Sequence, residues 1–345
     1  MSRILASAAV FTVLAAPVAH GRTLASRASG ATSWAAPEIR VVVSHGLMAR
    51  SVATFRPDDT LTQGELAALV GGLTEQPVQR PATPAAPVTV AELDARLVRA
   101  LGLGAAAQTF RRNAIAAGLF TPTRFGTEAV ARLLGLRTNH PARRDDLELR
   151  PNDPVTRAET AYSAAQILRF RGWDTDAAAA AADTFTLPKL TRWKIRVLSV
   201  GVHFIGFPYV WGGTSERAEA PFGVQARGGF DCSGFVWRVF KLQSYEGGAA
   251  LSQTLRGRTT YAMSGEVPRA KRIAFAKLRP ADVVFFGARG PRSRPAEVDH
   301  MGIYLGDGWF IHSSGYGVAV AQLSGWYRDR FAWGRRPLAE AGLTG

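Results

Sequence analysis

Cysteine is almost absent from this sequence: among its 345 residues, only Cys232 is a cysteine. A single thiol cannot form a disulfide within the chain, so no internal cross-link supports the fold. A buried cysteine that acts as a small apolar side chain is the ordinary use of such a residue. The residues around Cys232 must therefore show whether its thiol has a chemical role.

Lysine is also scarce. The net charge is +15, yet the chain has only five lysines, so arginine carries most of the positive charge. Such a charge favours contact with a polyanion, unless it merely reflects a GC-rich genome. The chain has no basic run interleaved with aromatic residues and no recognisable nucleic-acid module, so we expect no nucleic-acid partner.

Long apolar runs are missing after the first twenty residues, which excludes a later transmembrane helix. At the N-terminus, Arg3 precedes an apolar run over 4–16 and small residues over 17–21. This order is typical of a secretory signal peptide, although an ordinary buried helix would also fit. We therefore expect a signal peptide over 1–21, a secreted protein without a membrane anchor, and a flexible tail over 22–36.

Three segments between residues 37 and 172 share one pattern, a Thr followed three residues later by Glu and then by an apolar helix. They are 62–65, 89–92 and 156–159. Thr at the N-cap and Glu at the third helical position satisfy each other's backbone donors, which is a capping box. Repetition of this unit predicts a mainly α-helical repeat domain over 37–172.

The pattern changes towards the C-terminus. Residues 173–188 include a run of alanines and indicate a linker or a short helix between two domains. In residues 189–340 helical periodicity comes first, and short strands separated by Gly-rich turns follow from Val283 onward. The chain is therefore expected to contain an α+β domain with helices first and an antiparallel sheet after them.

Cys232 stands where a helix should begin. Asp231 suits the N-cap, and the apolar residues at 235, 236, 239 and 240 mark an amphipathic helix that follows it. The partial positive charge of a helix N-terminus favours a thiolate over a thiol. Since a thiolate attacks carbonyl carbon, we predict that Cys232 is a nucleophile.

A cysteine nucleophile needs a base, and two of the six histidines lie in the predicted sheet, His300 and His312. Residues 306–308, Gly-Asp-Gly, form a turn between their strands. A three-residue loop places both side chains on the same face, whereas a two-residue loop separates them. We predict the three-residue loop, with His300 as base and His312 orienting its ring.

Two other uses of the histidine pair remain open. Both could be ordinary polar residues on the sheet surface. Together with Cys232, they could also supply the three protein ligands of a zinc site. We nevertheless predict no metal and no cofactor.

Several blocks of this region resemble one family. They are 208–213, Pro-Tyr-Val-Trp-Gly-Gly; 230–235, Phe-Asp-Cys-Ser-Gly-Phe; 278–286; and the strand that begins at His300. In this order they resemble the NlpC-type papain-like cysteine peptidases of bacterial walls. The resemblance implies a papain-like catalytic domain that cleaves peptidoglycan stem peptides, commonly between D-glutamate and the following diamino acid.

The same resemblance implies roles for individual residues. Cys232 corresponds to the nucleophile, His300 to the base and His312 to the orienting residue. The residues that it places around the substrate are Tyr209, Asp231, Ser233, Arg258 and Thr260. Among these, the Tyr209 hydroxyl would stabilise the oxyanion and Asp231 would meet the free amine of the substrate. Residues 214–229 are a longer insert than is usual in the family and could form the rim of the cleft.

The helical segments resemble a second family. The lead-ins 55–59 and 149–153, with the Thr-Arg-x-Glu sequence at 156–159, resemble S-layer homology repeats. That resemblance implies binding of anionic wall polysaccharide, with Arg157 as a contact. The other two copies carry Gln63 and Val90 at that position, so either wall anchoring or a purely structural repeat is compatible with the sequence.

The sequence therefore predicts a secreted, cell-wall-associated cysteine peptidase that acts on peptidoglycan. An amidase or acyltransferase on the same fold and a non-catalytic wall-binding protein are the alternatives. Deletion of residues 22–175 should weaken wall retention and leave cleavage of soluble peptides intact, as expected of two independent domains.

Overall fold

The computed structural model describes residues 29–343. The predicted signal peptide lies outside this range. Within it, no helix has the length and apolar composition needed to cross a membrane. The last part of the predicted flexible tail is packed instead: Ala35 is fully buried, and the Trp34 ring lies edge-on to His140 with 4.5 Å between ring centroids. The tail prediction is therefore wrong near residue 35, because these side chains pack into an apolar cluster of the N-terminal half.

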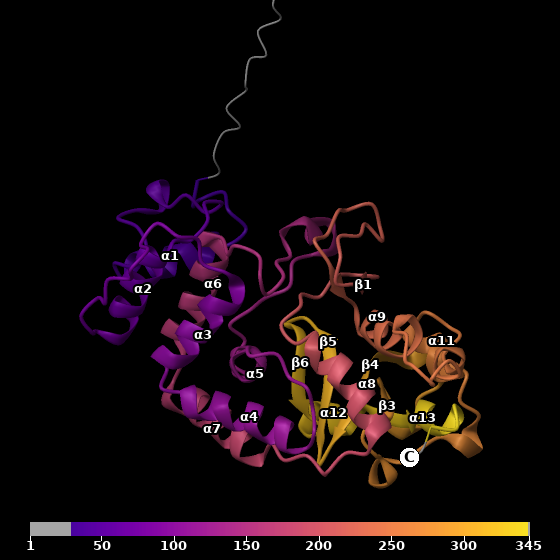
Figure 1. Cartoon of the computed structure of the whole chain (residues 1–345). Coiled ribbons are helices and arrows are strands. Elements are labelled where there is room, and N and C mark those ends of the chain that lie inside the picture. Colours follow the sequence, from indigo (N-terminus) through magenta and orange to yellow (C-terminus); the bar gives the residue numbers. More distant parts are fainter. Residues whose placement is uncertain (1–28, 344–345) are drawn as a thin grey trace, which may run out of the picture.

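The N-terminal half is an array of short helices (Figure 1). They are α1 (Ala36–Ser44), α2 (Gln63–Thr74), α3 (Val90–Ala100), α4 (Gly104–Ala116), α5 (Phe125–Leu133), α6 (Arg157–Arg169) and α7 (Gly172–Thr184). The capping boxes predicted for α2 and α3 are complete. In α6, Thr156 accepts the expected backbone hydrogen bond, but the Glu159 carboxylate turns inward to Arg137 at 3.2 Å.

The predicted linker over 173–188 is for the most part a packed helix. Helix α7 covers Gly172–Thr184 and packs against α4. Ala178, Ala182 and Phe185 are buried, so the alanine run supplies a narrow apolar face rather than a flexible connection.

The C-terminal half has helices followed by an antiparallel sheet, which confirms the predicted α+β class. Its helices are α8 (Arg192–His203), α9 (Cys232–Trp237), α10 (Leu251–Thr254), α11 (Thr260–Gly265), α12 (Gly325–Arg330) and α13 (Pro337–Glu340). Its strands are β1 (Thr214–Ser215), β2 (Gly229–Phe230), β3 (Val283–Gly287), β4 (Val298–Gly306), β5 (Trp309–Ser314), β6 (Gly317–Gln322) and β7 (Phe331–Arg335). The main sheet has the order β6-β5-β4-β3-β7, and α9 packs against β4 and β5.

The β4–β5 hairpin has the predicted register with a different turn. Ile303 pairs with Ile311, as an odd-length loop requires, but Gly306 pairs with Trp309 next to the turn. The loop itself is therefore the two residues Asp307 and Gly308, both with positive φ, and a bulge at 305 restores the register. The two histidines still share one face of the sheet.

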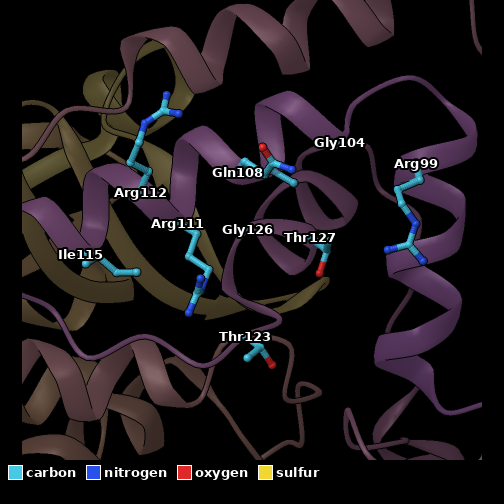
Figure 2. Close-up of a pocket in the computed structure, with 10 residues that line it drawn as sticks. Arg99, Gly104, Gln108, Arg111, Arg112, Ile115, Thr123, Gly126 and Thr127 are labelled. Atoms are coloured by element: carbon cyan, nitrogen blue, oxygen red, sulfur yellow. The ribbon is translucent and has the colours of Figure 1, made fainter.

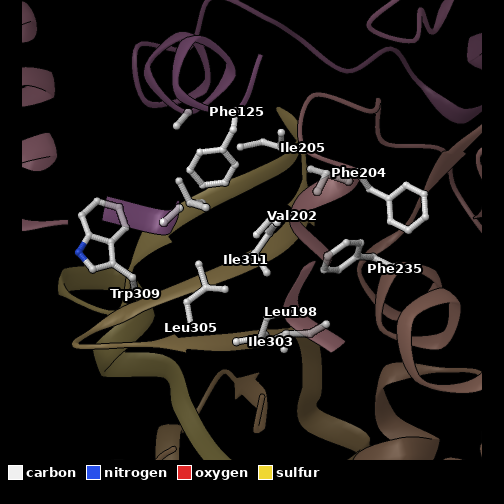
Figure 3. Packing of buried hydrophobic residues seen from close by; sticks show 14 of the residues in the cluster. Phe125, Leu198, Val202, Phe204, Ile205, Phe235, Ile303, Leu305, Trp309 and Ile311 are labelled. Atoms are coloured by element: carbon white, nitrogen blue, oxygen red, sulfur yellow. The ribbon is translucent and has the colours of Figure 1, made fainter. Parts of the chain in front are cut away.

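The two halves share one hydrophobic core. Figure 3 shows Phe125 of α5 beside Ile205 and Val202, with Trp309 and Ile311 of the sheet in the same cluster. Phe185, which follows α7, lies 5.0 Å from the Trp309 ring between centroids. Removal of residues 22–175 would expose this apolar surface, at about 1.5–3 kcal/mol for each large side chain. The structure therefore contradicts the expectation of two independent domains.

Candidate active site

Cys232 is the first residue of α9, as predicted. The Asp231 carboxylate caps the helix by accepting a hydrogen bond from the Gly234 amide at 2.5 Å. The helix continues from Trp237 into a π-helical turn over Arg238–Leu242. Cys232 is only 8% exposed, so most of its side chain is shielded from solvent.

The sulfur lies beside the start of β4. It makes a 3.5 Å contact with the Thr260 hydroxyl, and α9 packs against β4. His300 belongs to β4, so the sulfur lies at the helix that packs on the strand of the predicted base. Among the hydrogen bonds formed by residues 29–343, none joins the sulfur to the His300 ring. Such catalytic contacts often close only when substrate binds.

His300 and His312 form the predicted pair. His300 Nε2 lies 2.7 Å from His312 Nδ1, which leaves Nδ1 as the second nitrogen of the His300 ring. Three aromatic side chains surround the pair: Phe286 from β3, Phe310 from β5 and Tyr327 from α12. Among residues 29–343, no group of three or more His, Cys, Asp or Glu side chains could hold a metal ion.

Burial keeps these groups uncharged. It raises the pKa of the Cys232 thiol to about 11, with a further contribution from the Asp231 charge. Burial also lowers the pKa of His300 to about 4 and places the pKa of His312 well below its ordinary value. At neutral pH the resting site therefore holds a thiol and two neutral imidazoles.

Burial thus opposes the thiolate that was predicted from the helix start. A helix N-terminus stabilises a negative charge by about 0.3–1 kcal/mol. Loss of water around a buried sulfur costs more than this, as the raised pKa of Cys232 shows. Helix placement positions the sulfur, but it does not ionise it.

Tyr209 lies in the segment that leads from α8 to the insert. Burial raises the pKa of its phenol, and the nearby Asp231 carboxylate adds to the effect. The hydroxyl therefore stays protonated at all physiological pH values. It is available as a hydrogen-bond donor, and its role at the oxyanion stays a prediction.

Three of the predicted substrate-binding residues form one cluster. Ser233 Oγ donates to Asp231 at 2.8 Å and accepts from Arg258 at 2.7 Å. Asp231 also accepts from the Gly212 amide at 3.0 Å, and Arg258 donates to the Gly212 carbonyl at 2.8 Å. The Arg258 side chain keeps 32% of its surface exposed, so it alone in this cluster presents substantial charge to solvent.

The insert over 214–229 is an ordered loop closed by the β1–β2 pairing. Its Glu219 carboxylate accepts from the Thr214 and Ser215 amides at 2.6 and 3.1 Å, which anchors the turn. Phe222 at its tip is 70% exposed, and Trp211 just before it is 55% exposed. These two aromatic side chains are the apolar surface that the insert region offers to a ligand.

Arg157 has a different position from the one expected of a polymer contact. It is 3% exposed, and its guanidinium donates to the carbonyls of Phe55 and Met48 and to Glu65. It also stacks on the Phe55 ring, with 4.9 Å from Cζ to the ring centroid. In this structure Arg157 ties α6 to the start of the array and presents no charge at the surface.

Two residues near the site were missed by the sequence reasoning. Tyr327 covers the histidine pair from α12, and no motif singled it out. Arg132 of α5 donates to the Gly206 carbonyl at 2.7 Å, three residues before Tyr209. Both come from distant parts of the chain, so only tertiary contacts reveal them.

Comparison with known proteins agrees with this site. The NlpC/P60 family matches residues 206–336, and the S-layer homology domain matches residues 28–67. Over 142 residues the chain is 34% identical to the probable peptidoglycan endopeptidase LytE of Bacillus subtilis, covering 41% of this chain and 34% of that protein. The murein DD-endopeptidase MepH of Escherichia coli is 34% identical over 134 residues, with 38% and 41% covered.

A third relative is the gamma-D-glutamyl-L-lysine dipeptidyl-peptidase of Bacillus subtilis, 27% identical over 128 residues, with 37% of this chain and 34% of that protein covered. The chain thus spans between about a third and two fifths of the length of these relatives. The matched region contains Tyr209, Cys232 and both histidines, on the α+β fold predicted from the sequence. Residues 206–336 are thus similar to the NlpC/P60 family.

Proposed function

We propose that this protein is a cysteine endopeptidase that cleaves peptidoglycan stem peptides, and that it acts outside the cell at the wall. One observation carries the proposal. Cys232 is the first residue of α9, which packs against β4, and His300 of β4 lies 2.7 Å from His312 through its Nε2. This arrangement supports Cys232 as nucleophile, His300 as base and His312 as orienting group.

The proposed reaction begins from neutral groups. Nδ1 of His300 takes the thiol proton as sulfur attacks the carbonyl carbon, and the carbonyl electrons move to oxygen. His312 accepts from His300 Nε2–H and so stabilises the imidazolium. The Tyr209 hydroxyl donates to the oxyanion. The proton then passes to the leaving amine as the C–N bond breaks, and water hydrolyses the thioester to regenerate the thiol.

The residues beside the sulfur would hold the substrate. Arg258 is the exposed cation of the Asp231 cluster and suits a substrate carboxylate. The Asp231 carboxylate already accepts several hydrogen bonds, so its charge would assist a substrate amine at longer range. Thr260 holds the sulfur in place through its hydroxyl. We propose the bond between D-glutamate and the diamino acid as the site of cleavage, which the name of one relative supports.

Mass spectrometry of fragments released from purified wall tests this function. The wild type should release fragments with a new free amine on the diamino acid, and Cys232→Ala should release none. A new amine elsewhere would identify an amidase or another specificity. Wild-type protein that binds wall without releasing any fragment would show a non-catalytic binding protein, and full activity in Cys232→Ala would reject the mechanism.

For retention at the wall we propose a basic pocket of the array instead of Arg157. The pocket has a volume of about 450 Å³ and lies between α3, α4 and α5. Arg99 and Arg111 flank Thr127 there, whereas Arg112 points away (Figure 2). None of the ion pairs within residues 29–343 includes these three arginines, and the buried Arg111 Nε has no hydrogen-bond partner. A carboxylate or phosphate group of a wall polysaccharide would pair with the guanidinium groups of Arg99 and Arg111.

Sedimentation with purified walls tests the pocket, using Cys232→Ala throughout so that the wall is not digested. The double exchange Arg99→Gln and Arg111→Gln should lower retention more than Arg269→Gln with Lys271→Gln, which removes the same charge from an exposed part of the catalytic domain. Equal retention of both double variants would show that general charge, rather than this pocket, binds the wall.

A further inference from the structure

The histidine pair lies on a small apolar cluster of the sheet, separate from the main core. The buried members of this cluster are Val284, Phe286, Phe310, Leu323 and Phe331. His300 is the cross-strand partner of Phe286, and His312 follows Phe310 by two residues, so both imidazoles share a face with these side chains. A cluster of this size cannot by itself shield the pair from water on its outer side.

Helix α12 covers the pair from that outer side through Tyr327. The Tyr327 ring lies 4.9 Å from the Phe310 ring and 5.3 Å from the His312 ring between centroids, edge-on in both cases. Its centroid is 6.2 Å from that of His300. The other residues of α12 are exposed except Arg330, so Tyr327 is the residue through which the helix contacts the imidazoles.

Two arginines hold α12 in this position. Arg330 forms an ion pair with Asp299, the residue directly before His300. Arg328 stacks on the Phe275 ring, with 3.4 Å from Cζ to the ring centroid. A helix of six residues has little stability of its own. These tertiary contacts therefore fix the place of the Tyr327 ring.

The enclosure of the imidazoles is aromatic on three sides. Phe310 stacks on His312 with centroids 4.6 Å apart, Phe286 lies 5.7 Å from His300, and Tyr327 closes the third side. Water at this place would compete for the hydrogen bond between the two rings and would stabilise a charged imidazole. The low pKa of His300, about 4, agrees with the exclusion of water.

The charged groups nearest to His300 do not replace this enclosure. Asp299 and Arg330 have opposite effects on the pKa of His300, and they pair with each other. Strand β3 carries no titratable side chain. The titratable residues on β4 and on the other surrounding elements are Asp299, Tyr304, His312, Cys232 with its cap Asp231, Tyr261, Tyr327, Arg328, Asp329 and Arg330.

We infer that Tyr327 is a positioning residue of the reaction, whose ring keeps water from the imidazole pair and holds His312 against His300. The inference rests on the proposed function, because it needs His300 to act as the base. The contacts are made by the ring, so phenylalanine should serve in place of tyrosine. The role concerns the base itself, and cleavage of a small soluble peptide should depend on it.

Full-length variants test the inference with a soluble peptide that contains a γ-D-glutamyl–diamino acid bond, with kcat/KM measured from pH 5 to 9. The wild type should keep its rate down to about pH 5, since the pKa of His300 is about 4. In Tyr327→Ala water reaches the pair, so the acid limb moves towards the ordinary histidine value of 6.5. The rate of this variant should fall about tenfold between pH 7 and 5. Tyr327→Phe should keep the wild-type rate and pH profile.

Trp326→Ala is the matched control. It removes an aromatic ring from the same helix, but Trp326 is 57% exposed and its ring contacts Tyr327 rather than either histidine. Its pH profile should be that of the wild type. Thermal unfolding checks that each variant is folded. If Tyr327→Ala does not fold, Arg328→Gln takes its place, because it loosens α12 at Phe275 without removing the Arg330 charge beside His300.

Three results would overturn the inference: a wild-type pH profile in folded Tyr327→Ala or, in its place, Arg328→Gln, even with a lowered Tm; the same shift in Trp326→Ala as in Tyr327→Ala; or a loss in Tyr327→Phe as large as in Tyr327→Ala. Failure of the proposed function has a different signature. In that case the wild type does not cleave the peptide, or Cys232→Ala cleaves it at the full rate.

Discussion

The helical array and the catalytic domain each bury a cluster of titratable side chains, and burial has opposite consequences in the two. In the array, opposite charges are paired: Arg137 lies 3.2 Å from Glu159, and His140 lies 3.1 Å from Glu148. In the catalytic domain, Cys232, His300 and His312 are buried without a charged partner that would ionise them.

This difference separates a structural cluster from a reactive one. Paired charges that have lost their water must keep their partners, so the array cluster locks its helices in one arrangement. Uncharged groups at hydrogen-bond range can exchange a proton when a substrate supplies the driving force. Loss of water therefore holds the helices of the array in one arrangement. In the catalytic domain it keeps the reactive groups uncharged, so that they can exchange a proton.

The largest effect is expected when the proposed base, His300, is removed. His300→Ala should lower kcat/KM by about 10³-fold, as expected for loss of a general base, with little change in Tm. His312→Ala should cost about 10²-fold, because it only misaligns the base. Steady-state kinetics on a soluble peptide measure both, and equally small losses would remove the pair from the mechanism.

The array cluster should respond in the opposite sense. Arg137→Met removes one partner of a buried pair and should lower the free energy of unfolding by about 3–5 kcal/mol. Chemical denaturation measures this value, and Arg143→Met, an exchange at an exposed arginine, is the control. A stable Arg137→Met variant would mean that the buried charges of the array do not hold its helices together.

The pH dependence of stability sharpens the contrast further. Burial raises the pKa of Glu128 to about 7, so the folded state binds more protons than the unfolded state between pH 4.5 and 7. The contribution of Glu128 to the free energy of unfolding is thus fully present below pH 4.5 and is lost as pH rises through 7. Glu128→Gln should remove up to about 3 kcal/mol of this decline, at about 1.4 kcal/mol for each pKa unit.

The histidines of the site shift stability the other way. Their lowered pKa values mean that the folded state binds fewer protons between about pH 4 and 6.5, so stability from them rises across that window. Unfolding titrations of wild type, Glu128→Gln and His300→Ala at several pH values separate the two effects. Parallel curves for all three proteins would contradict both assignments.

The last prediction concerns the thiol itself. Since the pKa of Cys232 is raised to about 11, its alkylation by iodoacetamide should accelerate about tenfold per pH unit between pH 7 and 10. A thiolate–imidazolium pair would instead give a rate that is flat from about pH 5 to 8. Cys232→Ala is the control for labelling elsewhere.

The sequence predicted the parts of the site that depend on local pattern. A capping residue followed by an apolar face located the start of α9 at Cys232, and alternation in two strands brought His300 and His312 to one face. For the β4–β5 hairpin, the predicted register was right and the predicted loop length was wrong. The loop has two residues, and a bulge compensates for the shorter turn.

Other features depended on contacts that no local pattern encodes. Arg157 occupies the position of a repeat motif, yet carbonyl groups of the neighbouring segment enclose it. Arg132 donates to the Gly206 carbonyl although the two residues are 74 positions apart in the sequence. The ionisation of Cys232 likewise follows from how much water the packed core excludes, which the helix start does not determine.

The amino-acid sequence by itself determined which side chains can do chemistry here and on which elements they lie, because helix caps and strand alternation act over a few residues. The tertiary structure added that the array and the catalytic domain share one core, that Arg132 of the array holds the Gly206 carbonyl before Tyr209, and that burial opposes ionisation of the thiol. These properties arise from close packing and the exclusion of water, and both depend on residues that are distant in the chain.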